Sequence, residues 1–137
     1  MARIILISCV SKKLGKRAKA RDIYISPLFK YYLKYAKSLN PDKIFILSAK
    51  YGLLDLEKEI EPYNKTLIKM SSKEIKEWAD NVLSQLKEAS DLVNDEFIFL
   101  AGDRYRKYLI PYLSNYKVPL KGLGIGRQLK YLKEKTK

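Results

Sequence analysis

The sequence contains no histidine and only one cysteine, Cys9. The lack of histidine excludes a Ser-His-Asp or Cys-His nucleophile, and with one cysteine it leaves almost no means of building a zinc site. We therefore expect no metal and no cofactor. A single cysteine cannot form a disulfide within the chain, and the N-terminus lacks the long apolar region of a signal peptide, so a cytoplasmic location is predicted. Any chemistry would depend on carboxylates, Lys, Tyr, Arg, Ser or Cys9.

Long apolar runs are also missing. Stretches such as residues 4–7 are far shorter than the roughly 20 apolar residues that cross a bilayer, so no membrane partner is expected. The 137 residues are 47% hydrophobic and 31% charged, which is typical of a globular protein. This length suits one domain with a single core, and we place it over residues 1–137.

Positive charge is in excess and unevenly distributed. The formal net charge is +13, with 12 Lys/Arg against 2 Asp/Glu in residues 1–54, 6 against 11 in residues 55–96, and 10 against 2 in residues 97–137. Such a balance favours an anionic partner, either nucleic acid or a nucleotide-like anion. The alternative is a generally lysine-rich composition of the kind found in thermophiles.

The order of apolar patterns predicts an α/β fold. Buried strands are expected at residues 1–8, 43–47 and 96–102, and helices at 26–40, 71–89, just after Asp103, and near the C-terminus. Residues 9–21 are predicted to be a loop, and residues 52–70 an irregular excursion. The alternation predicts an open, mostly parallel sheet of three to four strands with helices on both faces.

In such a sheet, the loops after parallel strands meet at the carboxyl edge, where ligands bind. Three loops meet there: residues 9–21, 48–54 and 102–106. They bring several basic side chains together, and a helix N-terminus behind them would favour an anion. Taken singly, each of these lysines is more simply a solvated loop charge. The candidate ligand- or phosphate-binding residues are Ser8, Lys12, Lys13, Ser48, Lys50, Tyr51, Gly52, Tyr63, Arg104, Tyr105, Gly124 and Arg127.

Few residues are candidates for catalysis, namely Cys9, Asp103 and Tyr51. Cys9 follows a strand and could be a reactive thiol near Lys12, or simply a small buried residue. Asp103 follows another strand and could be an acid or base, or the N-cap of a short helix. Tyr51 could relay a proton, although its neighbour Lys50 should point in a different direction.

Two compositional features add to the binding hypothesis. Tyrosine occurs 11 times, often beside a basic residue, which suits stacking on bases as well as ordinary packing at the edge of a core. The glycines at positions 122, 124 and 126, followed by Arg127, could form a nest for an anion or only a tight turn. No Rossmann or Walker pattern is present.

Four segments resemble the YaaA-like peroxide-stress proteins: "ILISCVSKKL", "LSAKYGLLDLEKEIEPYNKTL", the tryptophan in "EWADNVLSQL", and "FIFLAGDRYRKYL". The sequence is more similar to a small, functionally unassigned family of about this length, which shares the run from Arg21 to Phe29 and the Gly-x-Gly-x-Gly-Arg-Gln-Leu end at 122–129. The YaaA-like resemblance covers Ser8, Lys12, Ser48, Tyr51, Gly52, Pro62 and Tyr63. The chain lacks the helix-hairpin-helix element of YaaA-like proteins.

The resemblance implies a DNA-related role in oxidative stress. The leading hypothesis is a nucleic-acid or nucleotide-binding protein, with DNA favoured over RNA, whose action on modified or damaged DNA bases is implied by the resemblance. The alternatives are a small-molecule enzyme for a nucleotide or phosphosugar, and a non-enzymatic adaptor. A pocket closed by residues 52–70 would favour the small-molecule enzyme, and an open basic groove would favour the polymer.

Overall fold

The computed structural model describes residues 1–9 and 12–137, and its centre is a five-stranded sheet in the order β4-β3-β1-β6-β7. The three central strands are parallel: β3 (Lys43–Ser48), β1 (Arg3–Ser8) and β6 (Glu96–Leu100). The edge strand β4 (Gly52–Asp55) runs antiparallel to β3, and the short β7 (Tyr116–Lys117) runs parallel to β6. The predicted α/β class is confirmed, and these two short edge strands bring the sheet to five.

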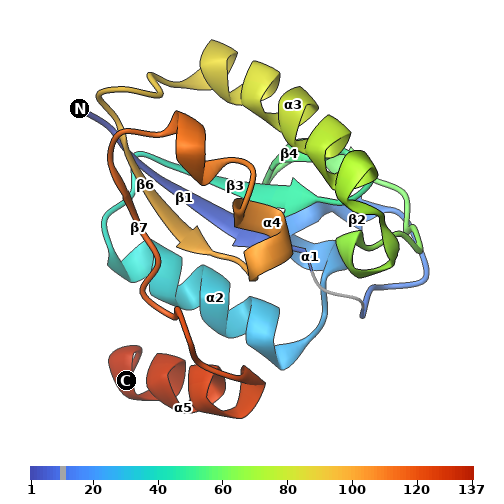
Figure 1. Cartoon of the computed structure of the whole chain (residues 1–137). Helices are drawn as coiled ribbons and strands as arrows, with labels where there is room; N and C mark the ends of the chain where they lie inside the picture. Colours follow the sequence, from blue (N-terminus) through green and yellow to red (C-terminus); the bar gives the residue numbers. More distant parts are fainter. Residues whose placement is uncertain (10–11) are drawn as a thin grey trace.

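The core explains why the central strands read as unbroken apolar runs. Ile4, Ile5, Leu6 and Ile7 of β1 are all completely buried, because β1 has a strand on each side and helices above and below (Figure 1). A strand covered on both faces cannot alternate between apolar and polar residues.

Helices cover both faces of the sheet, as predicted. Figure 1 shows α3 (Ser72–Ala89) on one face and α2 (Pro27–Ser38) on the other, with α5 (Ile125–Lys135) alongside α2 on the side away from the sheet. Both long helices begin where their capping residues predict. Ser26 Oγ accepts a hydrogen bond from the backbone N–H of Phe29, and Ser71 and Glu74 form a reciprocal capping box at α3.

Residues 52–70 are more regular than expected. They contain β4, β5 (Glu59–Ile60) and a short 3₁₀ helix, η1 (Leu67–Lys69). The strands β2 (Ala18–Lys19) and β5 form a second, two-stranded antiparallel sheet. The loop predicted over residues 9–21, of which residues 10 and 11 lie outside the described part of the chain, therefore ends in β2 and in the first turn of α1 (Ala20–Ile23).

The second sheet neutralises part of the basic N-terminal loop. Arg17 lies 3.3 Å from Glu61, and both Lys19 and Arg21 contact Glu57, at 3.0 and 2.7 Å. These ion pairs are largely exposed and so add little to stability. They do join the basic loop to the acidic middle segment, and the paired glutamates weaken the attraction of that loop for an external anion.

Candidate functional site

The carboxyl ends of the central strands lie together, as the sequence predicted. Ser8 ends β1 and Cys9 follows it, Ser48 ends β3, and Ala101 and Gly102 follow β6. The side chains in these loops nevertheless divide into three groups: a buried hydrogen-bond network around Ser48, a depression lined by Lys50, and a cavity lined by Cys9. Lys65 lines both the depression and the cavity.

The buried network is centred on Ser48, whose side chain is fully inaccessible. Its hydroxyl donates to the Tyr63 hydroxyl at 2.8 Å and accepts from the backbone N–H groups of Tyr51 and Lys50, at 3.0 and 3.3 Å. The Tyr63 and Tyr24 hydroxyls lie 2.6 Å apart. Burial raises the pKa of Tyr24 and of Tyr63 well above the ordinary range, so both phenols stay protonated. Ser48 therefore holds the following turn in place.

That turn depends on Gly52, which has a φ of 71°. A Cβ atom at this position would lie 2.5 Å from Gln85 Oε1, the atom that accepts a hydrogen bond from the Leu53 backbone at 2.8 Å. Glycine is thus required both by the backbone conformation and by the close approach of α3.

Lys50 and Tyr51 do not share a cavity with Cys9. The Tyr51 ring packs edge-on against Tyr63, with centroids 5.6 Å apart. Lys50 lines a different depression, of about 270 Å³, together with Trp78 and two glutamates of α3. The Lys50 Nζ atom nevertheless lies 5.3 Å from the centroid of the Tyr51 ring, so the expectation that these neighbours point apart was wrong.

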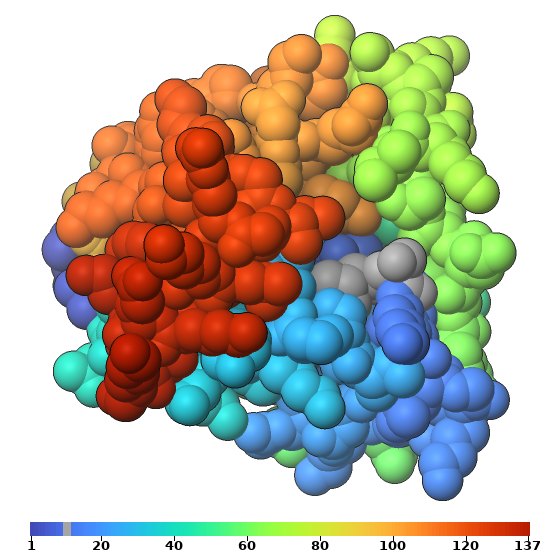
Figure 2. Space-filling view, turned by 90° about the horizontal axis from the view of Figure 1, so that it is seen from below, coloured from blue at the N-terminus to red at the C-terminus, as the bar shows by residue number. Residues whose placement is uncertain are grey.

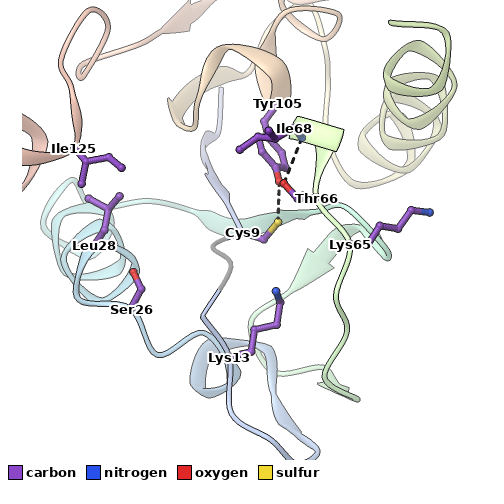
Figure 3. A pocket seen from close by; sticks show the side chains of 9 residues that line it. All are labelled: Cys9, Lys13, Ser26, Leu28, Lys65, Thr66, Ile68, Tyr105 and Ile125. Carbon is purple, nitrogen blue, oxygen red and sulfur yellow. Dashed lines mark hydrogen bonds between the residues drawn. The ribbon is translucent and has the colours of Figure 1, made fainter. Parts of the chain in front are cut away.

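The third group, around Cys9, surrounds a cavity of about 300 Å³ just beyond the end of β1 (Figure 3). Cys9 and Tyr105, both largely buried, form part of its wall, with Cys9 Sγ 3.2 Å from the Tyr105 hydroxyl oxygen in a hydrogen bond that either group can donate. Burial, and secondarily the electrostatic influence of Cys9, raises the pKa of Tyr105 above the ordinary range, so Tyr105 remains a neutral phenol. The other residues that line the cavity are Lys13, Ser26, Leu28, Lys65, Thr66, Ile68 and Ile125.

Lys13 brings a cation to this cavity. Its Nζ atom lies 4.4 Å from the centroid of the Tyr63 ring and 5.7 Å from that of Tyr24. Partial burial lowers the pKa of Lys13, and the nearby Cys9 opposes this shift. Lys65 lines the cavity from the segment before η1 and is exposed, so two lysines from different parts of the chain reach one cavity.

An adjoining depression, also of about 300 Å³, continues the cavity toward α4 (Asp103–Arg106). It shares Cys9, Tyr105 and Ile125 with the first and adds Ser8, Asp103 and Arg104, among others. Tyr32 and Gln128 also line this depression. The Tyr32 hydroxyl donates a hydrogen bond to Gln128 Oε1 at 2.5 Å. Ser8, Arg104 and Tyr105 thus lie together, as the sequence predicted.

Asp103 does not cap α4. The N-cap is Gly102, and no side chain forms a capping hydrogen bond. Asp103 is the first residue of the helix, and its side chain is exposed. The N-cap prediction was wrong because the helix already includes Asp103, one residue earlier than the motif suggests. The carboxylate instead lines the adjoining depression, so its candidacy as an acid or base stays a prediction.

Three other predicted residues line neither the cavity nor the adjoining depression. Lys12 is exposed, and its carbonyl accepts from the Ile25 backbone. Gly124 is the N-cap of α5 with an ordinary φ of −71°, and Arg127 is exposed on the first turn of that helix. The positive φ of this region, 82°, belongs to Gly122. The glycine-rich segment therefore forms a turn, and no nest around Gly124 is needed to explain it.

Two exposed isoleucines at the cavity could not be identified from the sequence. Ile68 and Ile125 are 66% and 67% exposed, and both line the cavity and the adjoining depression. They come from η1 and α5, which lie far apart in the chain. Only the fold shows that two exposed apolar side chains border a cavity containing Cys9 and Lys13.

The charged groups near the cavity do not form a metal centre. Among residues 1–9 and 12–137, no cluster of three or more His, Cys, Asp or Glu side chains is placed to hold a metal ion. Within the same residues, no helix combines the length and apolar character needed to span a bilayer.

Comparison with known proteins gives one match. Residues 4–134 match a family of unknown function, DUF6884. The chain belongs to the DUF6884 family. This confirms the expected membership in a small, functionally unassigned family. No curated protein and no solved structure matches the chain, so the site of this DUF6884 protein must be interpreted from its own geometry.

Proposed function

We propose that this protein binds a nucleotide-sized anion in the cavity around Cys9 and Tyr105. The observation that carries the proposal is the pairing of exposed apolar side chains, Ile68 and Ile125, with the ammonium groups of Lys13 and Lys65 around one cavity. A ligand that suits both has a flat or apolar part and a negative part. A nucleobase joined to a phosphate has this character.

The size of the cavity supports a small ligand. A volume of about 300 Å³, with an adjoining depression of similar size, lies at the lower end of the range for small-molecule sites. Lys65, Thr66 and Ile68 belong to residues 52–70, the segment expected to cover a small-molecule site. The geometry therefore favours a single nucleotide over a base-paired duplex in this cavity.

The surrounding elements favour an anion. Ser26, the N-cap of α2, lines the cavity, as does Ile125, the first residue of α5. Both helices are long enough for their N-terminal N–H groups to attract negative charge. The lysines add to this attraction, while Leu28 and the isoleucines exclude water from one side of the ligand.

Cys9 and Tyr105 are the groups best placed to act on a bound ligand. They line the cavity and already share a hydrogen bond. A reduced thiol at this point suits the cytoplasm, where we propose that the protein works. The resemblance to YaaA-like proteins would make the nucleotide part of DNA.

Calorimetric titration with nucleoside monophosphates, ribose 5-phosphate and inorganic phosphate tests the proposal. We expect the nucleotides to bind more tightly than ribose 5-phosphate or phosphate, because only they contact the isoleucines. Ile68→Ala plus Ile125→Ala should weaken nucleotide binding about tenfold through lost apolar contact, and Lys13→Gln should weaken nucleotides and phosphate alike.

Matched controls are available elsewhere in the chain. Val93 is 63% exposed and lies before β6, away from the cavity, so Val93→Ala should leave binding unchanged. Lys50 lines neither the cavity nor the adjoining depression, so Lys50→Gln should also leave binding unchanged. If phosphate binds as well as any nucleotide, and the isoleucine variant binds like the wild type, the proposal is wrong.

A further inference from the structure

The two helices that line the cavity carry a row of lysines on their exposed sides. Lys30 and Lys34 of α2 and Lys130 and Lys133 of α5 are all exposed. We call these four residues the α2–α5 basic face. Within each helix the two lysines are three or four residues apart, so they lie on the same side.

The two halves of this face are neighbours in space. The Nζ atom of Lys133 lies 5.8 Å from the centroid of the Tyr31 ring, and Tyr31 follows Lys30 directly in the chain. Tyr35 of α2 and Tyr131 of α5 also pack edge-on, with centroids 6.0 Å apart. Figure 2 shows the two helices side by side on one side of the molecule.

The charge of this face is not balanced by nearby carboxylates. Helix α2 contains no acidic residue, and α5 contains only Glu134. In the described part of the chain, no ion pair involves a lysine of either helix. Basic residues in and beside β2, by contrast, are paired with glutamates. The α2–α5 basic face thus keeps its charge for an external partner.

The face leads to the cavity, because the first turn of each helix borders it. Leu28 in the first turn of α2 and Ile125 at the start of α5 both line the cavity. The contacts of Tyr32 with Gln128 and of Tyr35 with Tyr131 show that the helices run in the same direction. Their N-termini therefore meet at the cavity, and their lysines follow from it along both helices.

We propose that the ligand of the cavity is one unpaired nucleotide of a single-stranded nucleic acid, whose neighbouring phosphates lie on the α2–α5 basic face. This inference rests on the proposed function, because it assumes that the cavity holds a nucleotide. Lysines on two adjacent helices suit a flexible polyanion. A base must leave its stack and its pair to enter a cavity of this size, so a single strand binds at lower cost than a duplex.

The test compares a mononucleotide with single-stranded oligonucleotides of DNA and of RNA, each titrated at several salt concentrations. The variant carries Lys30→Gln, Lys34→Gln, Lys130→Gln and Lys133→Gln. We expect the wild type to bind an oligonucleotide more tightly than the mononucleotide and more tightly than the matching duplex. The variant should keep its mononucleotide affinity, while the slope of log affinity against log salt for the oligonucleotide falls by about 3, since each lost contact with a single strand accounts for about 0.7.

A control variant removes the same charge from elsewhere, through Lys58→Gln, Lys73→Gln, Lys76→Gln and Lys87→Gln, all at exposed positions. It should keep the oligonucleotide affinity and the salt slope. The inference is overturned if the control loses as much slope as the test variant, because bulk charge would then explain binding. It is also overturned if the test variant binds oligonucleotides like the wild type, while retained mononucleotide binding would leave the proposed function standing.

Discussion

Cys9 Sγ and the Tyr105 hydroxyl oxygen lie 3.2 Å apart in the wall of a cavity, although their positions in the chain differ by 96. Cys9 directly follows β1, and Tyr105 lies in α4, shortly after β6. These two parallel strands are neighbours in the sheet. The fold therefore places a thiol and a neutral phenol where the proposed ligand would sit. Trp78 packs edge-on against Tyr105, with ring centroids 5.7 Å apart, and this contact holds the phenol in position.

A bound nucleotide should protect Cys9 from alkylation. Because Cys9 is the only cysteine, the rate of labelling by iodoacetamide, followed by mass spectrometry, reports on the cavity alone. We expect the rate to fall as a nucleoside monophosphate saturates the protein, with half-protection near its dissociation constant. Equal labelling with and without a saturating nucleotide would show that the ligand does not cover Cys9.

Nucleotide binding should weaken as pH rises through the lowered pKa of Lys13. An ordinary lysine keeps its charge until about pH 10.4, but partial burial lowers the pKa of Lys13, so its attraction for a phosphate is lost at a lower pH. Titrations across the alkaline range should show this loss in the wild type. Lys13→Arg should remove it, since arginine stays charged, and an unchanged pH profile in that variant would exclude Lys13 as the titrating group.

Gly52→Ala should destabilise the protein by about 1–3 kcal/mol, measured by urea unfolding, because alanine is strained at positive φ. The added Cβ would also lie 2.5 Å from Gln85 Oε1, which must then release the Leu53 N–H. Gly15 provides the control, since its surroundings are open within 4 Å and its φ lies outside the positive range. Gly15→Ala should change stability by only a few tenths of a kcal/mol, and equal losses in the two variants would contradict this account of Gly52.

Ser48 and Tyr63 should be energetically coupled. Ser48→Ala removes the donor to the Tyr63 hydroxyl and the acceptor for two backbone N–H groups, at a cost of about 1–3 kcal/mol. Tyr63→Phe leaves both the Ser48 and Tyr24 hydroxyls without this partner. A double-mutant cycle should give a coupling energy on the order of 1 kcal/mol. Additive losses would show that the two hydroxyls act independently, and Tyr112→Phe, at a 60% exposed position, serves as a neutral control.

The central strands and long helices could be predicted from the sequence because each carries a local signal. The buried run of β1 and the capping box of α3 both depend on residues close together in the chain. The edge strand β4 was missed because Gly52–Asp55 is short and is a strand only through its pairing with β3, which the local sequence does not indicate. The start of α4 was misplaced by one residue because glycine and aspartate are both acceptable N-caps.

The candidate site could be predicted only in part, for a related reason. The carboxyl edge follows from the order of strands and helices, which brought Cys9, Ser8 and Tyr105 to one place. Which side chains then face a cavity depends on packing, and packing turned Ser48 inward and Lys50 to another depression. The exposure of Ile68 and Ile125 is likewise a property of the folded surface.

The central claim is tested most directly by a crystal structure of the protein soaked with a nucleoside monophosphate. The account predicts density for the base beside Ile68 and Ile125, and for the phosphate within reach of Lys13 or Lys65. Density for the nucleotide only in the depression beside Lys50 and Trp78, or an empty Cys9 cavity at a saturating concentration, would contradict it.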